Sequence, residues 1–557
     1  MKHTLLLFAL ILMAPALAVA QPSWTKKAAK SVFTLKTFAT DGTLIASSYG
    51  VFTGTEGQAV SSYQPFKGAA SAVVIDMGGK EYPVTFILGA NETYDVVRFQ
   101  VDAKKTQPLT VATAASAQDA TVYLLPYREQ KQPRQGTIRK AETFNGDYAY
   151  YTLALAMPQD GAGLPLVDSQ GQLIALMQPW SAAGADTLCY AVSARFADSL
   201  KINGLSINDA ALRAIGIKKA LPDDPSQALL TLFVASSTTD SLAYAQMVDD
   251  FIVKFPDEQD GYITRAQLHA AASQYEQADA DMAQAVKVGT KKDEAHYSYS
   301  RLIYQKALYQ TAYDYPAWTL ERALDEAKAA YSVNPLPLYL QQQAYVLYAQ
   351  KEYAQASALY NQLTTSDLRS PELFVEAAQC RLVQGDSVGR LALLDSAVAL
   401  FSRPYLREAA PFLQMRAQAR MEAARYRDAV TDLNDYEQLM AQQVNDNFYS
   451  LRFQAETEGR LFQQALNDIA KAIQMNPQNE VYYAEKASLE VRVGLYDEAI
   501  ATATECTRLV PEFSDGYLFL GLAQCLKGQK AEGVKNLLRA KELGDNQADA
   551  LIERYGK

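Results

Sequence analysis

The chain has 557 residues, a formal net charge of −10 and 20% charged residues. A single hydrophobic core rarely grows beyond about 250–300 residues, so this length predicts several structural units. The acidic balance offers no basic stripe for nucleic acid or for an anionic membrane, and it excludes both as expected partners.

Residues 1–20 are typical of a secretory signal peptide. A basic start precedes an almost wholly apolar segment over 5–17, and small residues end it. We expect cleavage between Ala20 and Gln21, with a retained signal anchor as the alternative. The residue directly after that site is glutamine and not cysteine, so no lipoprotein anchor is expected. No later stretch reaches the roughly 18–20 apolar residues of a membrane span. We therefore predict a periplasmic or secreted protein without an integral membrane span.

Residues 24–205 predict many short strands. β-Branched and aromatic runs alternate with turn dipeptides, a spacing typical of a β-barrel or a β-sandwich. The runs lie at 31–35, 72–75, 82–87, 96–101, 121–125 and 172–176, and the turns are Asp41-Gly42, Gly78-Gly79, Asn145-Gly146 and Gln170-Gly171.

The pattern changes after Pro222, where alanine-rich apolar residues at helical spacing continue to the end of the chain. Such a change of period indicates a new domain. We therefore place a linker at 206–224, a helical array at 225–547 and a C-terminal tail at 548–557.

Within the helical array, three residue types recur at an interval of 34 residues. The recurring pairs are Pro477 and Pro511, Ala465 and Ala499, and Phe462 and Tyr496. An aromatic residue followed three positions later by alanine also occurs at Tyr426/Ala429, Tyr353/Ala356 and Tyr275/Ala278. A generic helical bundle does not explain three residue types at identical offsets.

This pattern resembles the tetratricopeptide repeat (TPR), a helix–turn–helix unit of 34 residues. One helix pair cannot bury its own apolar face, so the resemblance implies an all-α superhelical solenoid in which neighbouring units complete the core. We count about nine helix pairs between 225 and 547. The spacing is stretched over 293–336 and irregular over 371–445.

The TPR resemblance implies a groove lined by the first helix of each unit. A groove of Gln, Tyr and Leu side chains suits an extended or helical segment of another protein. Some TPR domains clamp a partner's C-terminal carboxylate with Lys and Asn, which are absent from these positions. The groove candidates are Gln341, Gln342, Tyr345, Tyr348, Val375, Gln379 and Leu382.

The β-rich part, over residues 28–205, resembles the trypsin-like domain of HtrA (Deg)-type serine proteases. The resemblance lies in the order and spacing of four segments, at 47–52, 59–69, 94–99 and 160–167. It implies a double β-barrel, with a generic β-sandwich as the alternative.

Protease chemistry of this type needs a serine, an imidazole that takes its proton and a carboxylate that orients the imidazole. The resemblance places these three groups on Ala162, Gln64 and Asp95, so only the carboxylate is kept. Residues 24–205 contain no histidine, and the loop over 157–165 contains no Ser, Thr or Cys. We therefore predict a pseudoprotease without catalytic residues.

Two further features of the sequence concern catalysis by the β-rich part. Asp160 and Leu164 replace glycines of the nucleophile loop, which weakens the case for an oxyanion hole. A Ser–Lys pair built from Ser61 or Ser62 and Lys67 is a conceivable substitute, although polar turn residues explain these side chains more simply.

No metal or cofactor site is expected. The two histidines outside the signal peptide, His269 and His296, lack a metal-ligand spacing, and the four cysteines form no CxxC motif. Cys506 and Cys525 fall on consecutive predicted helices, so a disulfide and two buried thiols both remain open.

Taken as a whole, the sequence predicts an exported scaffold or adaptor that binds protein or peptide partners in the cell envelope. An active serine hydrolase with a displaced nucleophile, or with a site completed by a partner, is the alternative. A periplasmic chaperone-like holdase is a further alternative.

Overall fold

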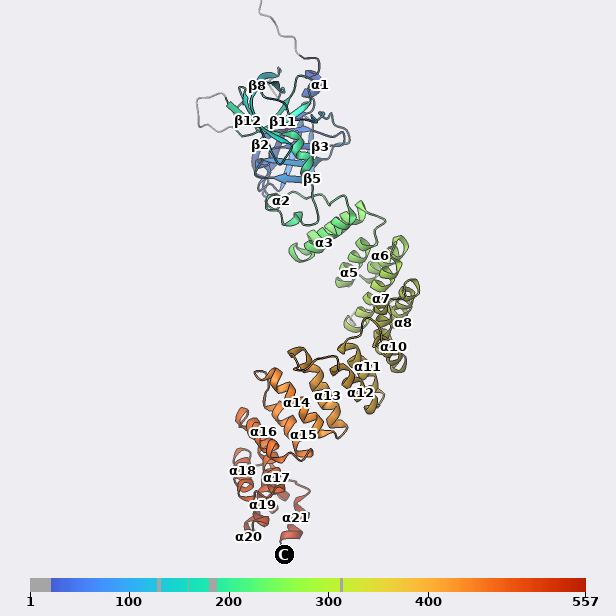
Figure 1. Cartoon of the computed structure of the whole chain (residues 1–557), viewed down its shortest axis with the longest axis vertical. Coiled ribbons are helices and arrows are strands. Elements are labelled where there is room, and N and C mark those ends of the chain that lie inside the picture. The colour runs from blue at the N-terminus through green and yellow to red at the C-terminus, as the bar shows by residue number, and fades with distance from the viewer. Residues whose placement is uncertain (1–21, 128–131, 159, 180–187, 311–313, 557) are drawn as a thin grey trace, which may run out of the picture. The chain divides into compact units, whose positions relative to one another are not determined.

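The computed structural model describes residues 22–556 except 128–131, 159, 180–187 and 311–313 (Figure 1). It divides into two compact units, one holding residues 1–269 and 283–290 and the other 270–282 and 291–557. The predicted signal peptide and its cleavage site at Ala20 and Gln21 lie outside the described residues.

The β-rich part consists of two six-stranded antiparallel barrels (Figure 1). The first barrel closes in the order β1-β2-β3-β6-β5-β4 and the second in the order β10-β11-β12-β9-β8-β7. These two closed sheets confirm the double barrel that the sequence predicts and rule out the sandwich for the described strands. The strands of the first barrel are β1 Val32–Phe38, β2 Leu44–Phe52, β3 Gln58–Ser61, β4 Ser71–Asp76, β5 Glu81–Asn91 and β6 Val96–Val101. Those of the second are β7 Thr121–Leu124, β8 Arg134–Phe144, β9 Tyr148–Ala154, β10 Pro165–Val167, β11 Leu173–Met177 and β12 Leu188–Ser193.

Turn chemistry sets the hairpins of both barrels. Asn145 and Gly146 join β8 to β9 with φ values of 46° and 85°. A two-residue turn with both φ angles positive matches the right-handed twist of the flanking strands, which is why Asn-Gly is a strong hairpin signal. The other three predicted turn dipeptides also lie between consecutive antiparallel strands.

Residues 206–224 differ from the linker that we expected. Short helix α2 (Ala210–Arg213) and the chain after it place Leu212, Ile215 and Ile217 in the core of the first barrel. The backbone is tied to the same barrel, since the Gly216 N–H donates to the Ala69 carbonyl at 2.7 Å. This segment therefore completes the first barrel instead of leaving it.

The second half of the chain is a run of helices from α3 to α20, which make nine successive pairs in the described part of the array. The double barrel followed by this helical solenoid confirms the predicted fold class. The helices before residue 350 are α3 Pro225–Thr238, α4 Ser241–Lys254, α5 Gln259–Ala271, α6 Tyr275–Val288, α7 Lys292–Tyr309, α8 Leu320–Val333 and α9 Pro337–Ala349. The later helices are α10 Tyr353–Leu363, α11 Pro371–Val383, α12 Ser387–Val398, α13 Ala410–Glu422, α14 Tyr426–Met440, α15 Asp446–Glu458, α16 Phe462–Met475, α17 Glu480–Arg492, α18 Tyr496–Leu509, α19 Ser514–Leu526 and α20 Lys530–Glu542.

The alanines that repeat in the sequence are the points of closest packing. Ala356, Ala429, Ala465 and Ala499 each lie in the second helix of a pair and have no exposed surface. A methyl group at these positions lets the neighbouring helix approach, and a larger side chain would separate the two. The repeated prolines end the second helices, as at Pro477 after α16 and Pro511 after α18.

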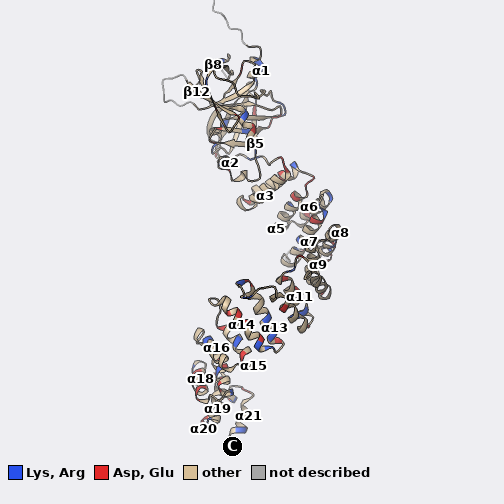
Figure 2. Ribbon diagram, viewed as in Figure 1, with Lys and Arg blue, Asp and Glu red and all other residues tan. Residues whose placement is uncertain are grey.

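Buried ion pairs brace two consecutive helix pairs at a fixed offset. Arg416 on α13 contacts Asp432 on α14 at 2.6 Å, and Arg452 on α15 contacts Asp468 on α16 at 2.5 Å. All four side chains are buried, and Figure 2 shows acidic and basic positions close together on these helices. Removing one partner of such a pair leaves an uncompensated buried charge, which costs about 3–5 kcal/mol.

The C-terminal residues also differ from the expected tail. Residues 548–555 form helix α21 (Ala548–Tyr555), and fully buried Ala548 packs with Leu518, Cys525 and Leu537. A terminal helix that covers the open face of the last repeat is the usual cap of a repeat array.

All four cysteines are free and buried, so Cys506 and Cys525 are two thiols in this structure. Among the described helices, none combines the length and the apolar character that crossing a membrane requires.

The turns between paired helices generate a stability prediction. The second residue after α13 is Ala424 with φ of 56°, and the second residue after α17 is Gly494 with φ of 82°. Left-handed backbone costs a side-chain-bearing residue about 1–2 kcal/mol, part of which the greater flexibility of unfolded glycine offsets. We expect Ala424→Gly to raise the free energy of unfolding of the array by about 1 kcal/mol.

Gly494→Ala is the matched control, because no atom lies within 4 Å of an added Cβ and the change tests backbone conformation alone. It should lower the same free energy by about 1 kcal/mol. Urea unfolding followed by far-ultraviolet circular dichroism measures both changes. Equal stability of the two variants and the wild type would contradict the assigned turn geometry.

Candidate functional site

Asp95 lies in the turn that connects β5 to β6, next to the second barrel. Its φ of 51° is left-handed, a region that Asp and Asn tolerate better than most residues. The carboxylate is 6% exposed, and its Oδ1 accepts a hydrogen bond from the backbone N–H of Gln64 at 2.7 Å. This bond ties the turn after β5 to the segment that follows β3.

Burial raises the pKa of Asp95 from 3.8 to about 6, and the backbone N–H of Gln64 offsets part of this rise. The other carboxylate oxygen, Oδ2, has no hydrogen-bond partner among the described residues. A buried carboxylate with an unsatisfied oxygen costs folding free energy. Residues 24–205 contain no histidine, so no imidazolium of this domain offsets this cost.

Gln64 begins the single turn of 3₁₀ helix over Gln64–Phe66, and its side chain is exposed while Pro65 and Phe66 are buried. The two sequence-predicted positions Gln64 and Asp95 are thus in direct contact through the backbone. A neutral amide does not exchange protons near neutral pH, so Gln64 cannot serve as a general base.

Ala162 lies in the loop before β10, and this loop packs on the first barrel. The Ala162 carbonyl accepts a hydrogen bond from the Tyr49 N–H of β2 at 3.3 Å. Gly163, with φ of 80°, approaches the Tyr49 carbonyl and the Ser61 hydroxyl so closely that a Cβ would clash. The loop therefore reaches the strand that leads into Gln64, but the side chain at 162 is a methyl group without nucleophilic character.

Leu164 occupies a loop position where the protease resemblance implies a glycine. Its side chain is fully buried in the core of the second barrel, and the Gly163 N–H next to it donates to the Met177 carbonyl at 2.8 Å. That backbone donor is engaged within the fold.

Three comparisons with known proteins bear on this geometry. Residues 37–176 match the family model described as a trypsin-like peptidase domain. The N-terminal part of this chain is a trypsin-like peptidase domain. The positions Gln64, Asp95 and Ala162 all fall inside the matched range.

Solved structures and one curated relative complete the comparison. The trypsin-like domain aligns with the serine endoprotease from Yersinia pestis at 16% identity and a TM-score of 0.28, covering 31% of this chain and 62% of that one. It aligns with the HtrA-type protease AlgW at 18% identity and a TM-score of 0.28, covering 33% and 62%. A small glutamine-rich tetratricopeptide repeat-containing protein of Saccharomyces cerevisiae is 28% identical over 95 residues, or 17% of this chain and 28% of the relative. The chain thus spans less than a third of the length of this curated relative.

An aromatic cluster, which sequence reasoning missed, holds the Asp95 turn of the trypsin-like domain. Tyr94 stacks on Phe144 of β8 with ring centroids 4.0 Å apart, and Phe196 packs edge-on against both rings. The three rings belong to segments far apart in sequence, so no local pattern could have revealed them. Aromatic pairs of this kind add about 0.5–1.5 kcal/mol each beyond area burial.

The possible Ser–Lys pair in the trypsin-like domain is not assembled. Lys67 Nζ binds Glu92 Oε1 at 2.6 Å, and this hydrogen bond raises the pKa of the Lys67 ammonium. Ser61 Oγ donates to the Tyr49 carbonyl, and Ser62 is fully buried. An ammonium held protonated by a carboxylate is a poor base for either hydroxyl.

The groove candidates of the helical array have different environments. Gln342 is buried and donates to Ser300 Oγ at 3.2 Å, so it is a core residue and not a groove residue. Gln341 and Tyr345 are linked to one another, and the Tyr345 hydroxyl donates to Glu376 Oε1 at 2.9 Å. The remaining candidates are at least partly accessible to solvent: Tyr348, Val375, Gln379 and Leu382.

No group of histidine, cysteine and acidic side chains within the described ranges is arranged to hold a metal ion. His296 contacts Glu326 at 2.6 Å, an interaction inside the array. We assign no cofactor-binding residue.

The buried Asp95 generates a pH prediction. Because folding raises the pKa of Asp95 from 3.8 to about 6, the folded state keeps a proton that the unfolded state releases. The free energy of unfolding therefore falls as pH rises between about 4 and 6, by at most about 3 kcal/mol. Asp95→Asn keeps an acceptor for the Gln64 N–H and removes the charge, so it should be more stable than wild type at pH 7 and independent of pH in this window.

Asp95→Ala is the control, because it leaves the Gln64 N–H without this acceptor, and it should be less stable than Asp95→Asn at every pH. Tryptophan fluorescence during unfolding reports mainly on the trypsin-like domain, since two of the three tryptophans are Trp24 and Trp180. An unchanged pH slope in Asp95→Asn would refute the assignment.

Proposed function

We propose that this chain is an exported polypeptide-binding scaffold in which the trypsin-like domain does not hydrolyse peptides and the TPR-type array binds the partner. The observation that carries the first part is the state of the three triad positions. Asp95 is in contact with the Gln64 backbone, but residues 24–205 contain no imidazole, and position 162 carries a methyl group. A serine nucleophile without an adjacent base is weak, and here the nucleophile is missing as well.

Support for a binding role in the array comes from its accessible first helices. Gln379 and Leu382 on α11 are exposed, and Leu382 is 40% accessible, although a repeat array normally buries its leucines between units. The curated relative that matches part of this chain is a tetratricopeptide repeat-containing protein. Such repeats present extended surfaces to other polypeptides.

The trypsin-like domain offers fewer sites for pairing with an extended chain. Each six-stranded sheet is closed, so every strand in the described barrels has two neighbours. Closed barrels leave no strand edge along which a peptide could add. We therefore assign binding to the array and a structural role to the trypsin-like domain.

Export to a periplasmic or secreted location is part of the proposal. It rests on residues 1–20, whose basic start, apolar segment and small residues are typical of a signal peptide.

The proposal predicts that the full-length protein neither cleaves denatured casein nor reacts with a fluorophosphonate probe. The physical reason is that no serine in the trypsin-like domain has an imidazole to take its proton. Gel electrophoresis of casein and mass spectrometry of the probe-treated protein measure the two outcomes.

Ser61→Ala and Ser62→Ala are the matched variants for any residual signal. Labelling or cleavage that disappears in one of them would establish a displaced nucleophile and overturn the non-catalytic role. Cleavage that persists in both variants and in Asp95→Asn, without labelling of this chain, comes from a contaminating protease and leaves the role intact.

The binding part is tested separately by chemical crosslinking to reduced, denatured casein. We expect crosslinked products that contain peptides of the array, with residues from 337 onward represented. Crosslinks confined to the trypsin-like domain would contradict the assignment of binding to the array.

A further inference from the structure

The last three complete helix pairs carry an open pocket of about 370 Å³. It is lined only by first helices of the pairs, namely α15, α17 and α19. This volume lies within the range of about 300–1,000 Å³ that is usual for ligand pockets. Sequence reasoning placed the groove candidates on α9 and α11 and missed this pocket.

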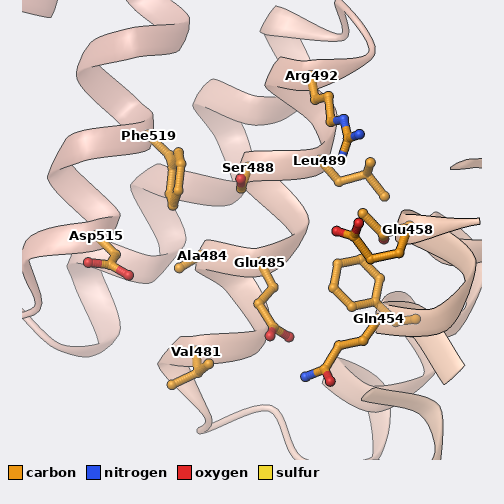
Figure 3. Close-up of a pocket in the computed structure, with 12 residues that line it drawn as sticks. Gln454, Glu458, Val481, Ala484, Glu485, Ser488, Leu489, Arg492, Asp515 and Phe519 are labelled. Atoms are coloured by element: carbon orange, nitrogen blue, oxygen red, sulfur yellow. The ribbon is translucent and has the colours of Figure 1, made fainter. Parts of the chain in front are cut away.

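Each of the three helices contributes one carboxylate and at least one large apolar side chain to the lining. Helix α15 supplies Glu458 and Phe453, α17 supplies Glu485 and Leu489, and α19 supplies Asp515 and Phe519. Carboxylates and apolar side chains therefore occur together on each of the three helices. Figure 3 shows the Phe519 ring and Asp515 on one side of the pocket and Glu458 on the other.

Glu485 is the carboxylate whose environment is incomplete. Its Oε2 is buried and has no hydrogen-bond partner among the described residues, and burial raises the pKa of this carboxyl group. The Gln454 side chain, which reaches toward Glu485 from α15 in Figure 3, offsets only part of that rise. The Thr457 hydroxyl in the same lining is also buried without a partner. A carboxylate oxygen accepts hydrogen bonds, so the group that Glu485 lacks is a donor, whereas the Thr457 hydroxyl can pair with a donor or with an acceptor.

The basic residues nearby are engaged elsewhere. The Arg492 guanidinium, the one basic group in the lining, lies 5.2 Å from the centre of the Phe462 ring. Lys486, on the same helix as Glu485, pairs with Glu490 at 3.4 Å. The lining thus holds three carboxylates and one guanidinium, an excess of negative charge around an unsatisfied buried oxygen.

We propose that this pocket binds a basic segment of a polypeptide, with a lysine ammonium at Glu485 and apolar residues on Val481 and Phe519, the accessible apolar side chains of the lining. A lysine side chain fits both components of the wall, because its alkyl stem packs on apolar surface while its ammonium has three hydrogen-bond donors. A free inorganic cation would leave the apolar walls uncovered. The inference rests on the proposed polypeptide-binding function and adds the charge of the ligand.

The ligand can meet more than one carboxylate. Glu458 ends α15, Glu485 lies in the middle of α17 and Asp515 lies in the first turn of α19. A segment that carries several lysines with apolar residues between them therefore suits this lining.

The test uses the full-length protein and a fluorescein-labelled peptide of four Lys-Leu-Ser repeats, measured by fluorescence anisotropy. We expect saturable binding of this peptide, and Glu485→Gln should weaken it about tenfold. Added salt should also weaken the binding. A peptide with Glu in place of Lys should not bind. Asp515→Asn is a second variant with an expected loss in the same direction. Glu498→Gln on α18 is the matched control, because Glu498 is exposed and outside the lining, and it should bind as wild type does.

Glu485→Gln also separates binding from folding. It removes a buried carboxylate that has an unsatisfied oxygen, so the ligand-free variant should melt at the same or a higher temperature than wild type while binding the lysine peptide more weakly. A variant that binds weakly because it is misfolded would melt lower, and Asp515→Asn then decides the question.

Three results would overturn the inference. The first is no binding of the lysine peptide at up to about 1 mM, and the second is binding by Glu485→Gln and Asp515→Asn that equals binding by the wild type. The third is competition by spermidine as strong as competition by the unlabelled peptide. The last result would assign the pocket to a free polyamine. Casein crosslinking that persists in any of these cases would preserve the polypeptide-binding scaffold and reject only the basic pocket.

Discussion

Close approach of paired helices at buried alanines is the constraint on which the array depends. Ala356, Ala429, Ala465 and Ala499 have no exposed surface, and each allows the first helix of a pair to lie directly against the second. The alanine face of the second helix is therefore buried against its partner, and part of the first helix stays accessible to solvent. Buried pairs such as Arg452 with Asp468 add a strong penalty for any change in the register of the two helices. The accessible positions of α15, α17 and α19 thus belong to a rigid frame, as a specific binding site requires.

The trypsin-like domain contains a feature that costs folding free energy. Asp95 stays buried, strained at φ of 51° and short of one hydrogen bond, while position 64 carries an amide and position 162 a methyl group. Its contact with the Gln64 N–H and the aromatic cluster around Tyr94 give it a structural role at the junction of the two barrels. This role does not require an imidazole at position 64 or a serine at position 162.

Sequence reasoning succeeded where a local rule has a direct structural consequence. The Asn145-Gly146 turn and the alanines at 34-residue spacing follow from backbone sterics and helix contact distance, and each occupies the predicted place. The contact of Gln64 with Asp95 followed from the order of segments in the protease resemblance.

Errors arose where tertiary packing decides the outcome. The apolar residues Leu212, Ile215 and Ile217 are too few and too irregularly spaced to signal an element, but they pack in the core of the first barrel. Gln342 resembles a groove residue by spacing, but it faces Ser300 on the neighbouring first helix α7 and satisfies that buried hydroxyl. The pocket at Glu485 needs three helices from three repeats, and no single repeat contains its pattern.

The central claim is that this chain binds polypeptide through its helical array without cutting it. Hydrogen–deuterium exchange of the full-length protein with and without the lysine-containing peptide tests this claim most directly, provided that the peptide is recovered and weighed by mass spectrometry. We predict slower exchange in α15, α17 and α19, unchanged exchange over residues 37–176 and a peptide of unaltered mass. Slower exchange around Gln64, Asp95 and Ala162 together with shortened peptide would contradict the account and return the trypsin-like domain to the class of active hydrolases.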